Sequence, residues 1–435
     1  MLYSAYSQKI SSPARSRKEP VSYLNIMVVG QTGTGKTAFV RTLCESLKHT
    51  IIQGTLKESK PMVLKDTLRP TDDLYTVSMH VEENGERTSL TVVDTPGFDQ
   101  SIDIEQQLRF VCTYIDHQYE RTLIEETKLR RDAKAVDTHI HACLYFLDTT
   151  SKTNLSDVDR YMLRVLSSRV NIIPVVGKAD TLTAVQRETI RKAYRWNFFD
   201  IFHIPVYGYI EIEKEDDLEQ EQQQEQEEQA SNASGEEEEE EGEGSQEEIH
   251  QEKKQAVATN HSGSEIMDTI MSMLKEYVEE DNDEDARAMY EYLEHFPLTL
   301  VGYEEDPETG RPVAIMRDSL KPQKQADTEE DQQPSSPQAH TQSRKKGRST
   351  KTVLGRKYPW AVVECSNPDH CDFERLKSMI LSVHRDMFRI DTFERFYEKY
   401  RTKQLMNRRF EGSPTINKGK LTNPSATTTH TKVHA

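Results

Sequence analysis

A glycine-rich segment near the start of the chain has the residue types and spacing to hold a phosphate group. Residues 24–37 read LNIMVVGQTGTGKT and contain the pattern G-x-x-x-x-G-K-[ST] from Gly30 to Thr37. Glycines let the backbone curl so that successive N–H groups face phosphate oxygens. Lys36 would then reach the β- and γ-phosphates, and the Thr37 hydroxyl would hold Mg²⁺. The alternative is a strand, turn and helix that match by chance. The apolar strand before the loop and the helix after it favour the phosphate site.

Two further motifs follow in the order that a nucleotide-binding sheet requires. Asp94-Thr95-Pro96-Gly97 ends an apolar run, where the aspartate can hold Mg²⁺ and the Gly97 N–H can sense a γ-phosphate. Gly177-Lys178-Ala179-Asp180 ends a later apolar run. A carboxylate there can accept hydrogen bonds from N1–H and N2–H₂ of guanine, a pair that adenine lacks, and Lys178 can lie over the base. The K-x-D pattern alone is common, but three motifs at strand ends predict a GTP-binding domain rather than an ATPase.

The residues that would drive hydrolysis are less complete. A signalling GTPase orients its attacking water with a glutamine four residues after the switch aspartate, and this chain has Phe98 at that position. An upstream threonine should also reach Mg²⁺ and the γ-phosphate. Thr71 is our candidate, with Thr67 and Thr76 as alternatives. We therefore expect slow GTP hydrolysis or none, with the nucleotide acting partly as a structural ligand.

Strands that alternate with helices must position these motifs. The expected strands span 24–29, 75–81, 89–93, 141–147, 170–176, 203–207, 295–302 and 358–364. The expected helices span about 38–47, 103–138, 157–168, 183–197, 265–274 and 373–383. Asn84-Gly85 suits a tight hairpin turn between two of the strands. Several strands are apolar on both faces, as buried parallel strands are. The pattern predicts an α/β fold with a mixed, mostly parallel sheet flanked by helices.

The charge of the chain is concentrated in one segment. Residues 211–250 hold 19 acidic residues and one lysine, a net charge of −18, which equals that of the whole chain of 435 residues. The rest therefore balances, so the low pI says little about the partners of the folded body. We interpret 211–262 as a disordered acidic insert and about 318–352 as a second polar insert. Residues 1–22 are interpreted as a disordered arm, and 411–435 as a disordered tail without the heptads of a coiled coil.

Cysteine usage and hydropathy favour an intracellular protein that does not cross a membrane. The five cysteines form no C-x-x-C pair and most lie in apolar segments, which suits buried thiols in a reducing cytosol. No apolar run approaches the roughly 20 residues that span a bilayer, and the start lacks the apolar core of a signal peptide. A basic cluster, Arg15, Arg17 and Lys18, is read as a solvated leader, with contact to anionic membrane lipids as the alternative. We expect no nucleic-acid partner.

The chain resembles the septins, the filament-forming GTPases of the cytoskeleton. The segments NIMVVGQTGTGKTAFV, LTVVDTPGF, RRDAKAVDTHIHACLYFLD, VNIIPVVGKADTLT and RKYPWAVVECSNPDHCDFERLKSMI resemble septin segments in the same order. They cover most of residues 23–405 outside the inserts. Tyr-Pro-Trp followed by a strand and a helix is similar to the C-terminal septin-unique element, which ordinary GTPases lack. The resemblance implies a septin-type GTPase domain over 23–410, with the unique element at about 353–405.

The resemblance also implies partners and further site residues. Septins build filaments through two alternating surfaces, one containing the nucleotide and the other the terminal elements. By that pattern Gly302 would lie near the guanine, Arg356 would stack on or clamp it, and Trp360 would lie in the nucleotide-side interface. A turn glycine, a solvated arginine and a core tryptophan are the alternatives. Gapless alignment places Thr71 at the switch threonine of hydrolysing septins.

Together these arguments predict one nucleotide site and one place in the cell. The expected GTP-contacting residues are Gly30, Gln31, Thr32, Gly33, Thr34, Gly35, Lys36, Thr37, Ala38, Gly97, Lys178, Asp180, Gly302 and Arg356. The expected Mg²⁺ ligands are Thr37, Asp94 and Thr71, of which Thr71 is also the catalytic candidate. The cofactors would be GTP or GDP with Mg²⁺, and the partners other septin subunits. The protein would act in the cytoplasm as a scaffold in the cytoskeleton. Its expected locations are the cell cortex and the septin ring at the division site.

The chain departs from the septin pattern in several places. Gly177 replaces the alanine of A-K-A-D, residues 148–152 lack the usual P-x-G-H histidine, and Asp99 replaces a switch glycine. These changes place hydrolysis and one interface in question and suit a divergent subunit. Two other classes remain open: a signalling GTPase that recruits effectors, and a pseudo-GTPase adaptor whose acidic insert binds basic partners.

Overall fold

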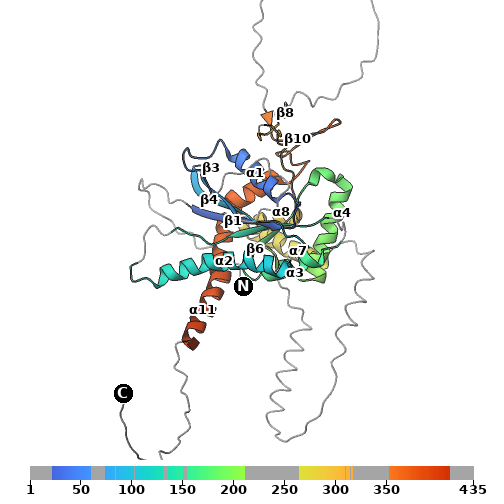
Figure 1. The fold of residues 1–435 in the computed structure, drawn as a ribbon. Helices are drawn as coiled ribbons and strands as arrows, with labels where there is room; N and C mark the ends of the chain where they lie inside the picture. The colour runs from blue at the N-terminus through green and yellow to red at the C-terminus, as the bar shows by residue number, and fades with distance from the viewer. Residues whose placement is uncertain are drawn as a thin grey trace, which may run out of the picture.

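The computed structural model describes residues 22–59, 74–83, 85–101, 103–130, 136–149, 154–210, 264–308, 310–313, 315–316 and 352–411. Within these ranges the chain forms one sheet covered by helices, with a long C-terminal helix, α11, that extends away from the sheet (Figure 1). In the part of the chain so described, no helix is both long and apolar enough to cross a membrane.

The central sheet has seven strands in the order β2-β3-β4-β1-β5-β6-β7. Its strands are β1 (Ser22–Gly30), β2 (Lys57–Glu58), β3 (Tyr75–Glu83), β4 (Glu86–Asp94), β5 (Ala142–Phe146), β6 (Asn171–Val176) and β7 (Leu298–Thr299). Strands β4, β1, β5, β6 and β7 are mutually parallel, whereas β3 pairs antiparallel with β4 and β2 antiparallel with β3. The prediction of a mixed, mostly parallel sheet flanked by helices is confirmed.

Helices connect and cover these strands. They are α1 (Lys36–Leu47), α2 (Ile104–Thr127), α3 (Asp157–Leu166), α4 (Ala184–Arg195), α7 (Glu265–Glu280), α8 (Glu284–Glu294), α9 (Phe373–Ser378), α10 (Arg385–Asp391) and α11 (Glu398–Glu411). Short turns of other helix types are η2 (Ala179–Thr181), η3 (Trp196–Ile201), η5 (Met379–Val383) and η6 (Thr392–Tyr397). Two small antiparallel strand pairs lie outside the main sheet, β8 (Ile315–Met316) with β9 (Thr352–Val353) and β10 (Gly355–Lys357) with β11 (Val362–Glu364).

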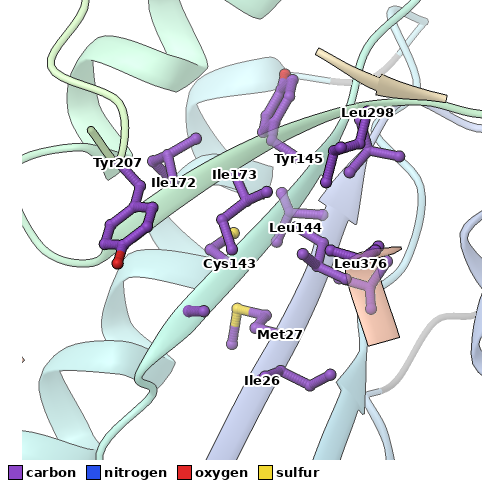
Figure 2. Packing of buried hydrophobic residues seen from close by; sticks show 14 of the residues in the cluster. Ile26, Met27, Cys143, Leu144, Tyr145, Ile172, Ile173, Tyr207, Leu298 and Leu376 are labelled. Carbon is purple, nitrogen blue, oxygen red and sulfur yellow. The ribbon is translucent and has the colours of Figure 1, made fainter. Parts of the chain in front are cut away.

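The core forms where strands apolar on both faces meet the apolar faces of helices. Every residue of β5 and β6 is buried. Side chains from β1, β5, β6 and β7 pack together and against Leu376 of α9 (Figure 2). In α2 the residues expected at helical spacing, Leu108, Val111, Ile115, Tyr119 and Leu123, are all buried. This packing holds the carboxyl ends of β1, β4 and β6 at one edge of the sheet, which is where the three motifs begin.

Three of the expected strands are wrong or too long. Residues 203–207 are no strand, because His203 has a left-handed backbone and Tyr207 donates only one backbone bond to β6. The strand at 295–302 shortens to Leu298–Thr299. The strand at 358–364 divides, because the Tyr358 N–H bonds the Ala361 carbonyl and closes a turn between β10 and β11.

The helices also differ from expectation. The helix expected over 103–138 ends at Thr127, and the one expected over 265–274 continues to Glu280. The closing helix divides into α9, η5 and further helices, and its expected apolar residue Val383 is exposed. The sequence analysis missed α8, α10 and α11.

The predicted disordered segments fall almost entirely outside the described residues. The arm 1–22 contributes only Ser22, which begins β1, and the acidic insert 211–262 contributes nothing that is described. The second insert ends one residue earlier than expected, because Thr352 belongs to β9. Glu411, expected in the tail, ends α11. The five cysteines are free thiols and all but Cys44 are buried.

His384 gives the fold a defined acid sensitivity. It is 2% exposed, its Nδ1 lies 2.9 Å from the Tyr207 hydroxyl, and burial lowers its pKa from 6.5 to about 4. As the pH falls, the unfolded chain therefore takes up this proton first. The stabilisation from the neutral ring is complete above pH 6.5 and is lost as the pH falls to about 4, at a cost of about 3 kcal/mol.

Replacing His384 by glutamine should flatten that acid dependence. We expect His384→Gln to be less stable than the wild type at neutral pH but to lose less stability between pH 6.5 and 4. Urea unfolding across that range measures the effect. The exposed His117→Gln serves as the matched control and should follow the wild type. Parallel pH profiles for wild type and His384→Gln would contradict the assignment.

Candidate nucleotide-binding site

The glycine-rich loop leaves the carboxyl end of β1 and leads directly into α1. Gly30, Gly33 and Gly35 have positive φ angles of 146°, 83° and 105°. At Gly30 a Cβ would lie 2.4 Å from the Phe146 carbonyl oxygen, so the strand can approach β5 only with glycine at this position. Because α1 begins at Lys36, the N–H groups of its first turn face the loop, together with the positive end of the helix dipole.

Lys36 lies beneath this loop rather than in solvent. Its Nζ donates to the carbonyls of Gly30 at 2.9 Å and Gln31 at 2.6 Å. The side chain is buried, and desolvation lowers its pKa from 10.5 to about 8, although Asp94 partly opposes this shift. An ammonium group has three donors, so one further proton can meet an anion held by the loop. Burial of the Lys36 charge destabilises the protein, and an anion bound beside it would offset that cost.

Thr37 and Asp94 form the candidate metal-binding pair. The Thr37 hydroxyl donates to Oδ2 of Asp94 at 2.7 Å. Among the described residues, none gives the buried Oδ1 atom of Asp94 a hydrogen bond. Burial raises the pKa of this carboxyl, although the Thr37 hydrogen bond and the Lys36 charge oppose the shift. A hydroxyl and an unsatisfied carboxylate oxygen are hard ligands of the kind Mg²⁺ takes alongside phosphate oxygens and water. The residues therefore fit Mg²⁺.

The segment after Asp94 is held against the loop. Phe98 donates its N–H to the Gly30 carbonyl at 3.1 Å and accepts from the Thr32 N–H at 2.9 Å. A Cβ on Gly97 would lie 2.6 Å from the Thr32 Cα, so this close approach requires glycine. The Phe98 side chain is buried in the core. It is neither polar nor directed at solvent, so it cannot orient an attacking water.

A buried polar network, which sequence reasoning missed, anchors the second residue of the loop. Gln31 donates to Oδ1 of Asp159 at 3.2 Å and accepts from the Gln100 amide at 3.1 Å. Asp159 is fully buried and also accepts from the Tyr145 hydroxyl at 2.8 Å and the Asp148 N–H at 3.2 Å. The network links the glycine-rich loop, α3 and the segment after Asp94 that contains Gln100. The only sequence signal was an acidic residue in the first turn of α3, which helices commonly carry.

The residues predicted to recognise the base converge at the end of β6. Lys178 adopts a left-handed backbone, and its Cγ would lie 3.8 Å from a Cβ built on Gly35, so its side chain runs beside the loop. Asp180 accepts at Oδ2 from Nη1 of Arg356 at 3.0 Å and from the Tyr358 hydroxyl. Its Oδ1 is buried and has no hydrogen-bond partner in the part of the chain that the structure describes. Arg356 also donates from Nε to the Gly302 carbonyl at 3.0 Å.

Arg356 links Gly302 to Asp180, and the contact of Gly302 and Arg356 with guanine stays a prediction. A Cβ on Gly302 would lie 2.9 Å from the Cβ of Ala38 in the first turn of α1, which joins the base end of the site to the phosphate end. The alternative of a solvated arginine is wrong for Arg356, which is half-buried and doubly hydrogen-bonded. Sequence reasoning gave no role to Tyr358, because nothing in the local pattern places it against Asp180.

Trp360 lies on the surface at the same edge of the site. It is 79% exposed and its ring stacks on that of Tyr358 at 5.5 Å and 18°. The alternative of a core tryptophan is therefore wrong. A large aromatic side chain presented to solvent in this way is typical of a binding surface.

Some of the remaining predicted residues lie in described parts of the chain and others do not. Thr34 lies within the loop, and its N–H and hydroxyl both bond the Gln31 carbonyl. Thr71 and its alternative Thr67 lie outside the described residues. Thr76 is in β3 opposite Val93. The structure thus brings together every expected site residue except Thr71.

Comparison with known proteins gives one consistent family. The family model of septins matches residues 21–246 and 313–413. The chain is 26% identical over 384 residues to septin homolog spn3 of Schizosaccharomyces pombe, covering 88% of this chain and 73% of that protein. It is 26% identical over 381 residues to human neuronal-specific septin-3, covering 88% and 75%. Against human septin-9 it is 24% identical over 382 residues, and spans only 45% of that longer protein.

Solved structures were compared as well. A septin GTPase domain from Chlamydomonas reinhardtii aligns with 88% of this chain and 98% of its own, at 18% identity and a TM-score of 0.47. Cdc11 from Saccharomyces cerevisiae aligns with 88% and 99%, at 18% identity and a TM-score of 0.39. The assignment rests on the family model, whose two matched ranges together cover well over half of the sequence. The chain belongs to the septin family.

Proposed function

We propose that this septin binds GTP or GDP with Mg²⁺ and serves as a subunit of hetero-oligomeric septin filaments. Septins bind guanine nucleotides, assemble into hetero-oligomers and are cytoskeletal. The observation that carries the nucleotide assignment is the buried, unpartnered Oδ1 of Asp180. A buried carboxylate oxygen without a partner is costly, and a guanine N–H would satisfy it. Adenine lacks the N1–H and N2–H₂ donor pair that guanine presents to a carboxylate.

The phosphates would lie in the loop from Gly30 to Thr37, with Lys36 beside the β- and γ-phosphates. Thr37 and Asp94 would hold Mg²⁺, which supplies positive charge to the phosphates when it is bound. Thr71 stays our candidate for the switch threonine. Phe98 is buried and apolar, so the position of the water-orienting glutamine carries no side chain that could do this work. This supports slow turnover and a mainly structural role for the nucleotide.

Two surfaces at opposite ends of β1 support assembly into filaments. At the nucleotide end, Trp360 is 79% exposed. At the Ser22 end a cavity of about 1020 Å³ is lined by residues that include the partly exposed apolar side chains Val136, Ile390 and Phe393. Exposed apolar groups at both ends suit a subunit that contacts neighbours on two sides, and they favour this function over a soluble signalling switch. The cell cortex and the septin ring at the division site are the proposed location.

The test is to identify what accompanies the protein from its own cells. After gentle purification in Mg²⁺, chromatography of the released nucleotide should give about one GDP or GTP per chain, and mass spectrometry should detect other septins. Adenine nucleotide or an empty site would refute the nucleotide assignment. Absence of septin partners, together with rapid nucleotide exchange in the isolated monomer, would instead favour the signalling switch.

A further inference from the structure

The carboxylate that would read the base is already half occupied by protein donors. Asp180 has a side chain that is 1% exposed. Its Oδ2 accepts from both Arg356 and Tyr358, whereas its Oδ1 has no partner. A carboxylate oxygen has two lone pairs, so two donors saturate Oδ2 and leave only Oδ1 for a ligand. Guanine presents two donors, N1–H and N2–H₂, which pair best with one oxygen each. Full recognition of guanine therefore requires one of the two protein donors to leave Oδ2.

Tyr358 is the donor that can leave at lower cost. Arg356 is charged, holds a second bond to the Gly302 carbonyl at 3.0 Å, and pairs with Val363 in the β10–β11 ladder. Tyr358 follows the last residue of β10, in the turn closed by its own N–H and the Ala361 carbonyl. Its hydroxyl is neutral and its side chain is only half-buried. Hydrogen bonds from charged donors are the stronger ones, so the hydroxyl yields before the guanidinium.

The Tyr358 ring is also the support of the exposed tryptophan. The two rings stack at 5.5 Å with an angle of 18° between their planes, and only Pro359 separates the residues in the chain. Movement of the Tyr358 hydroxyl away from Asp180 tilts or shifts this ring, and the Trp360 ring must follow or lose its stacking contact. Asp180 and the surface of Trp360 are thus mechanically connected through a single side chain.

We propose that Tyr358 is a specificity-determining residue of the base site, whose hydroxyl competes with the guanine N2 amine for Oδ2 of Asp180. Binding of guanine releases the hydroxyl and repositions Trp360 on the nucleotide-side surface. A purine that has N1–H but lacks the N2 amine needs only Oδ1 and leaves Tyr358 in place. The inference rests on the proposed guanine-nucleotide function and adds to it a link between base identity and the surface offered to a neighbouring subunit.

The experiment compares GDP with inosine diphosphate, which has N1–H but no N2 amine. Dissociation constants of both are measured for the wild type and Tyr358→Phe, which removes the hydroxyl and keeps the ring. GDP should bind Tyr358→Phe about 3- to 10-fold more tightly, because no hydrogen bond has to be broken, whereas inosine diphosphate binding should not change. The exposed Tyr161→Phe on α3 is the control and should leave both constants unchanged.

Tryptophan fluorescence gives a second readout that does not depend on the Tyr358 variant. The chain has two tryptophans, so in Trp196→Phe the tryptophan emission comes from Trp360 alone. GDP should change the Trp360 emission and inosine diphosphate should not. An equal effect of Tyr358→Phe on both nucleotides, a weaker GDP complex, or identical emission with both nucleotides would overturn the inference while leaving GDP binding in place. Failure of the wild type to bind GDP would instead overturn the proposed function.

Discussion

Lys36→Ala is expected to abolish nucleotide retention while leaving the fold intact. The Lys36 Nζ is held by the Gly30 and Gln31 carbonyls directly beneath the phosphate loop. Each charge-assisted bond from this group to a phosphate oxygen contributes about 1.5–3 kcal/mol. We therefore expect the affinity for GDP to fall by at least about 100-fold. Fluorescent-nucleotide titration and the nucleotide content after purification measure this loss.

The same substitution should hardly change the stability of the nucleotide-free protein. Keeping Lys36 charged at pH 7 with a pKa of about 8, against 10.5 in the unfolded chain, costs about 3 kcal/mol. Removing the ammonium relieves that cost, which offsets the loss of the two carbonyl hydrogen bonds and the small cavity that is left. The unfolding midpoint without nucleotide should therefore stay close to that of the wild type, whereas the stabilisation that GDP gives the wild type should vanish.

The matched control is Lys48→Ala, which removes the same charge just beyond the C-terminus of α1. The Lys48 side chain is 63% exposed and pairs with Glu45 at 2.9 Å. It should retain nucleotide as the wild type does. An unchanged nucleotide content in Lys36→Ala would refute the phosphate site, and a large loss of nucleotide-free stability would show that Lys36 is mainly a structural residue.

The sequence was sufficient for the elements whose patterns are local. The buried strands β1, β5 and β6 are continuous apolar runs, and a helix such as α2 carries its buried residues at the spacing of one face. Glycine motifs at the ends of these strands were informative because parallel strands bring their carboxyl ends to one edge. The phosphate end of the site followed from these facts alone.

The rest depends on contacts between residues far apart in the chain. Arg356 and Tyr358 meet Asp180 across 176 and 178 residues, and no local pattern records that approach. The aromatic run at Tyr358 has high strand propensity, yet it forms a turn because its N–H bonds the Ala361 carbonyl. The contact of Asp159 with Gln31 could not be predicted either, because an acidic residue at the start of a helix gives no sign of such a partner. The long-range polar contacts of Asp180 and Asp159 are therefore the part of the candidate site that the sequence could not predict.

Asp180→Asn should change the base that the site prefers. Guanine presents two donors, whereas the asparagine amide presents one acceptor and one donor, so its NH₂ group faces an N–H of guanine. Losing one charge-assisted bond and adding this mismatch should weaken GDP binding by about 100-fold or more. Xanthine carries a carbonyl in place of the N2 amine. It can accept from the new amide, so xanthosine diphosphate should bind Asp180→Asn more tightly than GDP does.

Competition titrations with the two nucleotides measure this preference, and Asp157→Asn is the control because its side chain is 88% exposed. A variant that still prefers GDP would show that Asp180 does not read the base. Because Lys36 lies beneath the phosphate loop and Asp180 at the base end, each should act on its own part of the ligand. Xanthosine diphosphate should therefore need Lys36 as much as GDP does. Adding Lys36→Ala to Asp180→Asn should remove the binding of xanthosine diphosphate. If the double variant still binds it, Asp180 and Lys36 do not belong to one nucleotide site.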